Sequence, residues 1–228
     1  MKMKKIGYIL ICILIANQAM AQENLAEIYR VGKIKLAVKA GFTMFRVKGN
    51  GVSELSAEGK SSNLNGFFTG LEGNIELNRF LGLQHSIAII QKGALLQLKD
   101  EQGQLFDSKY RNTYLEISPV SLTFNLKLLQ LYAGPYFSLL TASSIQRKNG
   151  SGYLYKDKSI FGEASSEGGY TQKMDAGFST GMNFNWKQIS VGFRYVHGLA
   201  PVIENSANIH GQESIYNRGL VFSTGYSF

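Results

Sequence analysis

The side chains suited to acid–base or nucleophilic chemistry are few in this chain. Its three histidines are His85, His197 and His210. A hydrolytic site needs a nucleophile and a base held within hydrogen-bond reach of each other. His85 and Ser86 are adjacent, so on a strand they point to opposite faces and cannot pair. His197 lies at a predicted strand end, near Glu204 in the following loop, and is the best candidate for a catalytic base.

Two further patterns suggest chemistry, and we read both as structural. The carboxylates Glu72, Glu76 and Glu116 could serve as acids and bases, but basic residues recur on the same predicted faces, which favours ion pairs. Gly59-Lys60-Ser61 mimics the end of a phosphate loop, but Glu54 replaces the required earlier glycine and no strand-to-helix context exists. No metal-ligand spacing appears. We therefore predict no catalytic residue, metal or cofactor.

The start of the chain has the features of an export signal. Lys2, Lys4 and Lys5 precede an apolar stretch that is shorter than the ~20 apolar residues of a spanning helix. Ala19 and Ala21 form an A-x-A cleavage site. We predict a signal peptide over residues 1–21, a short N-terminal segment over 22–33 and one domain over 34–228. The only cysteine, at position 12, lies in the leader, so no disulfide is expected.

The elements that must position any site are β-strands. Aromatic and β-branched residues recur with period two, and the chain holds 25 glycines against 3 prolines, which indicates an all-β protein. We predict eight strands, at 34–44, 66–78, 81–96, 110–125, 129–142, 175–186, 189–195 and 218–228. The phase slips at Ser118-Pro119, where we expect a bulge because proline cannot donate to a strand ladder.

The predicted connections alternate between short and long. Asn78-Arg79-Phe80, Leu126-Lys127-Leu128 and Lys187-Gln188 are tight turns. Longer polar loops are expected over 48–63, 97–109, 143–170 and 200–217. In an up-and-down barrel every second connection lies at the same end, so the long loops share one end and the turns the other. Outer-membrane barrels show this asymmetry, with short periplasmic turns and long external loops.

Alternation alone does not decide which face of a barrel is outside, since a soluble lipocalin-like barrel turns its apolar face inward. The polar face here is rich in glycine, as a narrow interior requires, and carries balanced charges that can pair there. These predicted lumen charges are Lys35, Lys39, Lys92, Arg194, Glu72, Glu76, Glu116 and Asp175. We therefore predict that the apolar face meets lipid and that the lumen is plugged.

The C-terminal strand supports this orientation. Phe222, Tyr226 and Phe228 share its apolar face, and a terminal phenylalanine with an aromatic residue two positions earlier is the signal that bacterial barrels present to their insertion machinery. The prediction is an eight-stranded antiparallel up-and-down transmembrane β-barrel in a Gram-negative outer membrane, with both termini periplasmic. Expected partners are membrane lipid, lipopolysaccharide and the insertion machinery. The net charge of +8 is scattered, which argues against nucleic acid.

Short motifs extend the interpretation to a family. They are Lys39-Ala40-Gly41-Phe42, Gly66 to Leu71, Tyr114-Leu115-Glu116-Ile117 with Pro119, Ala133-Gly134-Pro135-Tyr136, Phe193-Arg194-Tyr195 with His197-Gly198-Leu199, and Gly225-Tyr226-Ser227-Phe228. In their order and spacing the chain resembles the PorT-like outer-membrane barrels of the Bacteroidetes lineage, although Ser118 interrupts the usual run from isoleucine into proline. The resemblance implies a non-enzymatic structural, surface-interaction or type IX secretion-accessory role, with secretion components as partners. A hydrolase with a rim site near His197 and a narrow small-solute channel are the alternatives.

Overall fold

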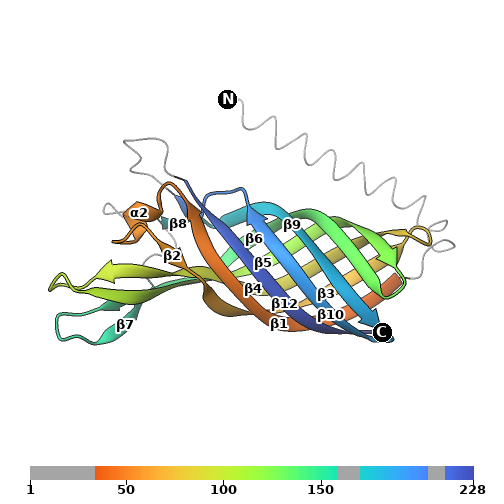
Figure 1. Cartoon of the computed structure of the whole chain (residues 1–228), viewed down its shortest axis with the longest axis horizontal. Helices are drawn as coiled ribbons and strands as arrows, with labels where there is room; N and C mark the ends of the chain where they lie inside the picture. The colour runs from red at the N-terminus through yellow and green to blue at the C-terminus, as the bar shows by residue number, and fades with distance from the viewer. Residues whose placement is uncertain (1–33, 159–169, 205–213) are drawn as a thin grey trace, which may run out of the picture.

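The computed structural model describes residues 34–158, 170–204 and 214–228. Eight long strands wind obliquely around a common axis (Figure 1). They are β1 (Ile34–Gly49), β3 (Leu64–Glu76), β4 (Leu81–Lys99), β5 (Leu105–Leu126), β6 (Leu129–Lys148), β9 (Met174–Trp186), β10 (Ile189–Gly198) and β12 (Ile215–Ser227). The predicted signal peptide with Ala19 and Ala21, the segment 22–33 and His210 lie outside the described residues.

Smaller elements lie between the long strands. They are α2 (Val52–Leu55), β2 (Ser61–Ser62), β7 (Leu154–Asp157), β8 (Tyr170–Thr171) and β11 (Ile203–Glu204). Strand β2 pairs with β4, β7 with β6, and β8 with β11. Within the part of the chain that the structure describes, no helix is long and apolar enough to cross a membrane.

The ring closes between the first and last strands. Strand β1 pairs with β3 on one side and with β12 on the other, both antiparallel. Phe42, for example, lies opposite Phe67 on β3 and opposite Phe222 on β12. With β4 also paired to β5, each of the eight strands has two neighbours and the barrel has no open edge along this ring. The predicted eight-stranded antiparallel barrel is confirmed.

The two ends of the barrel differ. The tight connections at 77–80, 127–128 and 187–188 lie at one end, which we call the turn end, together with the C terminus (Figure 1). The opposite end, which we call the loop end, carries α2 and the short strands. The sequence predicts that all three tight turns lie at the same end of the barrel, and the structure confirms this (Figure 1).

The predicted loop over 97–109 is wrong for most of its length, and the predicted loop over 143–170 is wrong at 143–148 and 154–157, while residues 159–169 lie outside the described part of the chain. Strands β4 and β5 continue past the barrel as a hairpin, with Gln97 paired to Asp107 and Leu98 to Phe106. Strand β6 likewise continues to Lys148 and pairs with β7. Both segments are polar, and polarity alone predicts a loop. A strand outside the membrane has no lipid-facing positions, so it can be polar and still form a complete ladder.

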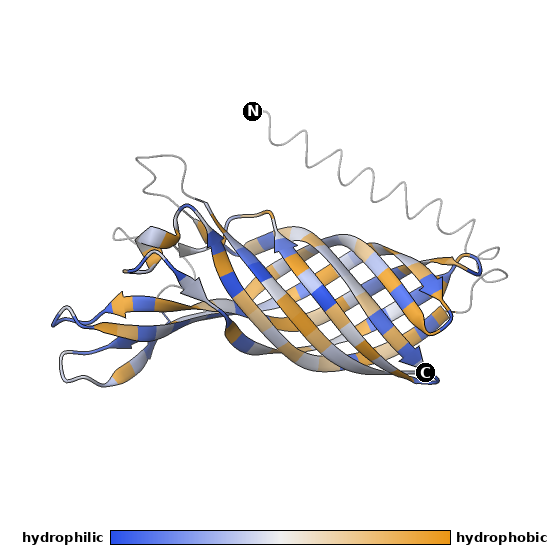
Figure 2. Cartoon of the chain, viewed as in Figure 1, coloured by the Kyte–Doolittle hydropathy of each residue, from blue (hydrophilic) through white to orange (hydrophobic). Residues whose placement is uncertain are grey.

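The apolar face is the outer wall. Hydrophobic and hydrophilic residues alternate along the barrel strands (Figure 2). Phe178 is 57% exposed and Leu122 68% exposed, whereas Lys92 is 1% exposed and faces the lumen. On the wall the rings of Phe42 and Phe222 stack at 4.8 Å. The orientation predicted from the sequence, with apolar side chains outward, is confirmed.

The predicted bulge is also present. The β4–β5 register shifts between Gln84 and Ser86, and the β5–β6 register shifts between Ile117 and Leu122. Pro119 and Val120 are consecutive exposed residues, while Ser118 and Ser121 on either side are buried. Two residues thus share the outer face where strict alternation allows one, which is the geometry of a β-bulge.

Candidate functional site

The centre of the lumen holds four buried charges that pair in a row. Arg194 Nη1 lies 2.8 Å from Glu116 Oε1, and Lys92 Nζ lies 2.8 Å from both Glu116 Oε2 and Asp175 Oδ2. Two cations and two anions make the row neutral. Ser138 donates to Glu116, and Asn217 donates to Asp175. A buried charge is tolerated when it is paired and hydrogen-bonded in this way.

Aromatic rings surround the amino group of Lys92. Its Nζ lies 4.2 Å from the ring centroid of Tyr136, 5.2 Å from that of Tyr114 and 5.9 Å from that of Phe45. The Tyr136 hydroxyl also donates to Asp175. A desolvated cation over aromatic faces gains energy from the ring quadrupoles. The arrangement has the elements of a cation-holding cage, and its cation is the protein's own lysine.

The other four predicted lumen charges form two separate pairs. Lys39 Nζ lies 2.7 Å from Glu72 Oε2, and both side chains are buried. Lys35 Nζ lies 2.6 Å from Glu76 Oε1 at the turn-end mouth, where the two side chains are 53% and 42% exposed. The eight residues are therefore brought together as one row of four and two pairs. They do not form a single network.

Sequence reasoning missed an apolar and aromatic layer inside the lumen. Its members are Phe45, Phe68, Ala88, Ile90, Tyr114, Tyr136, Leu140, Val196 and Val221. The rings of Phe45, Tyr114 and Tyr136 are fully buried. A signal was available, because Tyr114 lies two positions from Glu116 and so shares its inward face. The predicted lumen, of glycines and charged residues alone, lacks this aromatic component.

A second buried apolar cluster closes the loop end. It contains Val47, Val52, Ala94, Leu96, Tyr110, Ile145, Val202 and Ile215, with Leu55, Leu98 and Ile203 packed against it. Helix α2 contributes Val52 and Leu55. The cluster joins strands β1, β4, β5, β6 and β12 to the connections at this end. The lumen is thus filled by charged pairs, then aromatic rings, then an apolar cap.

The turn end is open by contrast. A polar cavity of about 310 Å³ enters there, lined by Lys35, Glu76, Lys127 and Lys187 among others. It reaches inward as far as Lys39 and Glu72. Beyond it lies a space of only about 20 Å³ beside Arg194 and Tyr132. The cavity is a vestibule that ends at the buried charges.

The candidate catalytic base lies outside the lumen. His197 is exposed and lies opposite Phe178, an outward residue, with its ring 6.2 Å from that of Tyr195. The buried carboxylate of Asp175 lies in the lumen, on the opposite side of the barrel wall from His197. In the described ranges the contact shown for the His197 ring is Tyr195.

The other sequence motifs, within the described residues, also lack a catalytic arrangement. His85 is exposed on the wall, and Ser86 points inward beside it, so the two lie on opposite faces of β4. Gly59-Lys60-Ser61 leads from α2 into β2, so it lacks the following helix of a phosphate loop.

The C-terminal aromatics lie on the wall. Phe222 stacks on Phe42 and meets Phe193 edge to face, and the Tyr226 and Phe228 rings meet at 5.3 Å near the turn end. The Phe228 N–H donates to the Leu36 carbonyl, so the last residue is still part of the ladder. In the described ranges no group of three or more His, Cys, Asp or Glu residues could hold a metal ion.

A closed eight-stranded ring, an apolar outer wall and a filled polar lumen define a small transmembrane β-barrel. The family model for the outer membrane protein beta-barrel domain matches residues 20–204, and the chain belongs to this family. It is therefore a bacterial outer-membrane protein. None of the curated proteins compared with the chain matches it.

Several solved structures are similar in outline. Neisserial surface protein A is 12% identical, with a TM-score of 0.47 over 85% of this chain and 97% of that one. OprG of Pseudomonas aeruginosa is 11% identical, with a TM-score of 0.44 over 86% and 97%. Ail of Yersinia pestis, solved with the heparin analogue sucrose octasulfate, is 13% identical, with a TM-score of 0.42 over 86% and 99%.

Proposed function

We propose that this protein is a non-enzymatic, non-conducting barrel that anchors an interaction surface in the outer membrane. The turn end and both termini face the periplasm, and the loop end faces outward. The observation that carries the proposal is the combination of a filled lumen with a sheet that continues beyond the barrel at the loop end. A filled lumen removes the usual use of a barrel as a pore, and a projecting sheet supplies a surface.

The projecting sheet consists of the β4–β5 and β6–β7 hairpins, and the β5–β6 ladder that joins them reaches as far as Tyr110 and Ile145 (Figure 1). Its two hairpins are tied together by Lys148 and Asp100, whose side chains lie 3.1 Å apart. Arg147 pairs with Asp157 across β6 and β7 at 2.7 Å. An isolated two-stranded hairpin is only marginally stable in water, and these ion pairs add contacts within and between the two hairpins.

The surface of this sheet combines cations with exposed apolar and aromatic side chains. Tyr153 is 74% exposed and Leu154 56% exposed. Basic residues outnumber acidic ones on the projecting segments, which hold Lys99, Lys109, Arg147, Lys148, Lys156 and Lys158 against Asp100, Glu101, Asp107 and Asp157. Anionic groups, such as the phosphates of lipopolysaccharide, suit such a surface.

The resemblance to PorT-like barrels favours a secretion-accessory version of this role. In that version the partner on the loop or turn end is a component of the type IX route. Deleting the gene would then leave secreted proteins in the periplasm, and normal secretion would remove this version while leaving the anchor role intact.

Orientation is tested by single-cysteine labelling of intact cells. The predicted mature chain has no cysteine, so Gln102→Cys at the tip of the β4–β5 hairpin and Gln188→Cys in a tight turn are matched reporters. A membrane-impermeant maleimide should label the first and not the second. Labelling only at position 188 would show that the turn end faces outward, and it would refute the proposal.

The interaction surface is tested by charge removal. Replacing the exposed Lys99, Lys109 and Lys156 with glutamine leaves the Arg147–Asp157 and Lys148–Asp100 pairs intact and should weaken binding of the purified barrel to lipopolysaccharide about tenfold or more, with a reduced salt dependence. The control replaces Lys35, Lys127 and Lys187 at the turn end, which removes the same charge. Equal losses in both variants would show that net charge alone matters.

The channel alternative is tested in planar bilayers. The wild-type barrel should show no conductance, and stepwise conductance would support the channel alternative instead.

A further inference from the structure

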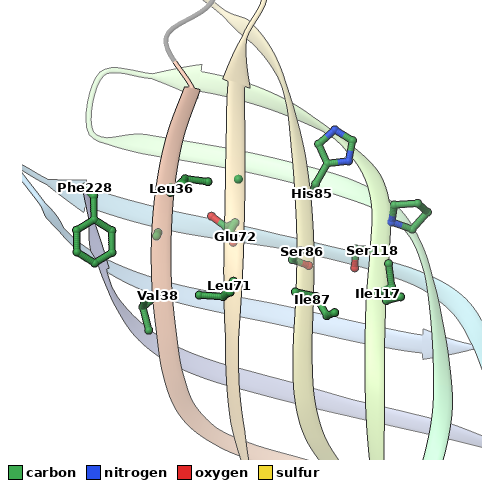
Figure 3. Close-up of a pocket in the computed structure, with 13 residues that line it drawn as sticks. Leu36, Val38, Leu71, Glu72, His85, Ser86, Ile87, Ile117, Ser118 and Phe228 are labelled. Atoms are coloured by element: carbon green, nitrogen blue, oxygen red, sulfur yellow. The ribbon is translucent and has the colours of Figure 1, made fainter. Parts of the chain in front are cut away.

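A groove of about 410 Å³ is hollowed into the outer wall near the turn end (Figure 3). It crosses four neighbouring strands and lies over two rungs of the ladder. The outer rung contains Leu36, Gly73 and His85, which are directly opposite one another on β1, β3 and β4. The inner rung contains Val38, Leu71, Ile87 and Ile117 on β1, β3, β4 and β5. Phe228 lies at its edge.

The hollow has two local causes. Gly73 places no side chain on the wall, and a Cβ there would meet only Leu36 Cδ2, at 3.6 Å. Beside it, the bulge at Ser118-Pro119 breaks the register between β4 and β5 next to His85. The glycine on β3 and the register shift between β4 and β5 are thus next to each other on the outer wall. Gly73, His85 and Pro119 all face outward, so the hollow opens on the wall.

The outward lining is aliphatic or aromatic except for His85. Leu36, Leu71 and Ile87 are 59%, 58% and 43% exposed, as lipid-facing side chains are. His85 lies among them, four residues from the start of β4, or roughly 13 Å along the strand. An ionisable side chain at a lipid-facing position is costly, and such residues mark functional sites. His85 therefore needs a polar partner that lipid itself can supply.

The groove is continuous with the wall that contacts the membrane, so its occupant is a lipid. A void against packed side chains would lose their dispersion contacts, whereas an acyl chain would fill it. Because outer-membrane strands tilt by about 35–45°, His85 is only about 10 Å from the start of β4 along the barrel axis, on the turn-end side of the wall. The polar groups of a phospholipid that lie next to the hydrocarbon, below the headgroups, are its ester groups. A histidine N–H can donate to an ester carbonyl oxygen.

We propose that this groove is a binding site for one glycerophospholipid, with an acyl chain lying over Gly73 between Leu71 and Ile87 and an ester carbonyl accepting a hydrogen bond from His85. The site lies on the wall and is distinct from the loop-end surface. Its tests use nanodiscs and detergent and do not depend on lipopolysaccharide binding at the loop end, so its failure and that of the surface proposal are separable.

The location is tested by photo-cross-linking in nanodiscs of phosphatidylcholine that carries a diazirine on one acyl chain. Cross-links should concentrate in peptides of β3, β4 and β5 and exceed those on β9 and β10. Gly73→Leu fills the groove and should lower the β3–β5 cross-links about tenfold. Ala133→Leu is the matched control, because Ala133 is exposed on the wall at β6, away from the groove. It should leave the pattern unchanged.

Two outcomes of that experiment overturn the proposal. Cross-links distributed evenly around the barrel would show ordinary annular lipid. Chemical cross-links between the groove residues of two chains, with dimers in solution, would show that a second copy covers the groove.

The hydrogen bond is tested separately by competition between ester-linked and ether-linked phosphatidylcholine, read by native mass spectrometry of the detergent-solubilised barrel. The wild type should retain the ester lipid preferentially, because the ether lipid lacks the carbonyl acceptor. His85→Leu should bind both equally, and it provides a second variant should Gly73→Leu fold poorly. A wild type without preference would remove the role of His85.

Discussion

Lys92 and Asp175 lie on strands β4 and β9, which are three places apart around the ring, yet their charged atoms are 2.8 Å apart. The pair therefore spans the lumen. Glu116 on β5 and Arg194 on β10 extend it into a row that connects both sides of the barrel. Because the barrel is narrow, long side chains from opposite walls can meet at its axis. Ion-paired side chains of the barrel strands therefore close the lumen.

Removing the central cation should be costly. In Lys92→Met, Asp175 loses its ion pair while remaining buried, and Glu116 keeps only Arg194. Breaking one partner of a buried pair costs about 3–5 kcal/mol. We expect the free energy of unfolding in phospholipid vesicles to fall by about that amount. Trp186, the only tryptophan, reports unfolding through its fluorescence in a urea titration.

Two variants define the meaning of that loss. Lys92→Met combined with Asp175→Asn removes the uncompensated charge and should recover part of the stability. Lys35→Met breaks the exposed pair with Glu76 and should cost well under about 1 kcal/mol. An equal loss in Lys35→Met and Lys92→Met would show that burial of the central row contributes nothing.

The barrel itself was predictable because a transmembrane strand obeys a strict rule. Each residue faces either lipid or lumen, so Phe178 and Asp175 fall on opposite faces in any correct register. The bulge at Pro119 was predictable for the same reason, as a break in that phase. Outside the membrane the rule lapses, and the hairpin that pairs Leu98 with Phe106 could not be distinguished from loop.

The partners of the lumen charges were not predictable. Alternation shows that Lys92 and Glu116 face inward, but which cation meets which anion depends on the stagger of strands around the ring. Sequence also gave no sign of the wall groove. That groove depends on Gly73 being level with His85 and next to the bulge, which is a property of register and not of any one strand.

The closing seam between β1 and β12 depends on a glycine. A Cβ at Gly41 would lie 2.7 Å from Ser223 Cα, against backbone that cannot move aside cheaply. We expect Gly41→Ala to lower the free energy of unfolding by about 1–3 kcal/mol. Gly73→Ala on the other seam of β1 has open space and should change it by less than about 1 kcal/mol. Similar costs for both glycines in urea titrations would contradict the close approach.

The tight turn between β9 and β10 carries strain. Lys187 adopts a φ of 56°, a left-handed conformation that asparagine or glycine adopts more easily. Lys187→Asn should raise the free energy of unfolding by about 0.5–1 kcal/mol. The neighbouring Gln188→Asn is the control and should bring no gain, since the φ of Gln188 is not positive. Urea titrations followed at Trp186 are again the measurement, and a loss of stability in Lys187→Asn would argue against relief of strain.

The tip of the projecting sheet should loosen in acid. The backbone N–H of Gln104 and the ammonium of Lys148 stabilise the Asp100 carboxylate and lower its pKa from the ordinary value of an aspartate. A group with a lowered folded-state pKa stabilises the structure above its unfolded pKa, and that contribution is lost as the pH falls through the folded value. The link between the two hairpins should therefore be complete at neutral pH and weaken only in acid, below the ordinary pKa range of an aspartate. Hydrogen exchange of the backbone amides of residues 100–104 should become faster in acid, relative to the intrinsic exchange rate at that pH.

Two variants serve as controls. In Asp100→Asn the same amides should exchange quickly at neutral and at acidic pH. Asp107→Asn, whose partner is the neutral Gln97, should behave like the wild type. A wild-type hairpin whose protection is unchanged in acid would show that the Asp100–Lys148 link does not hold the tip.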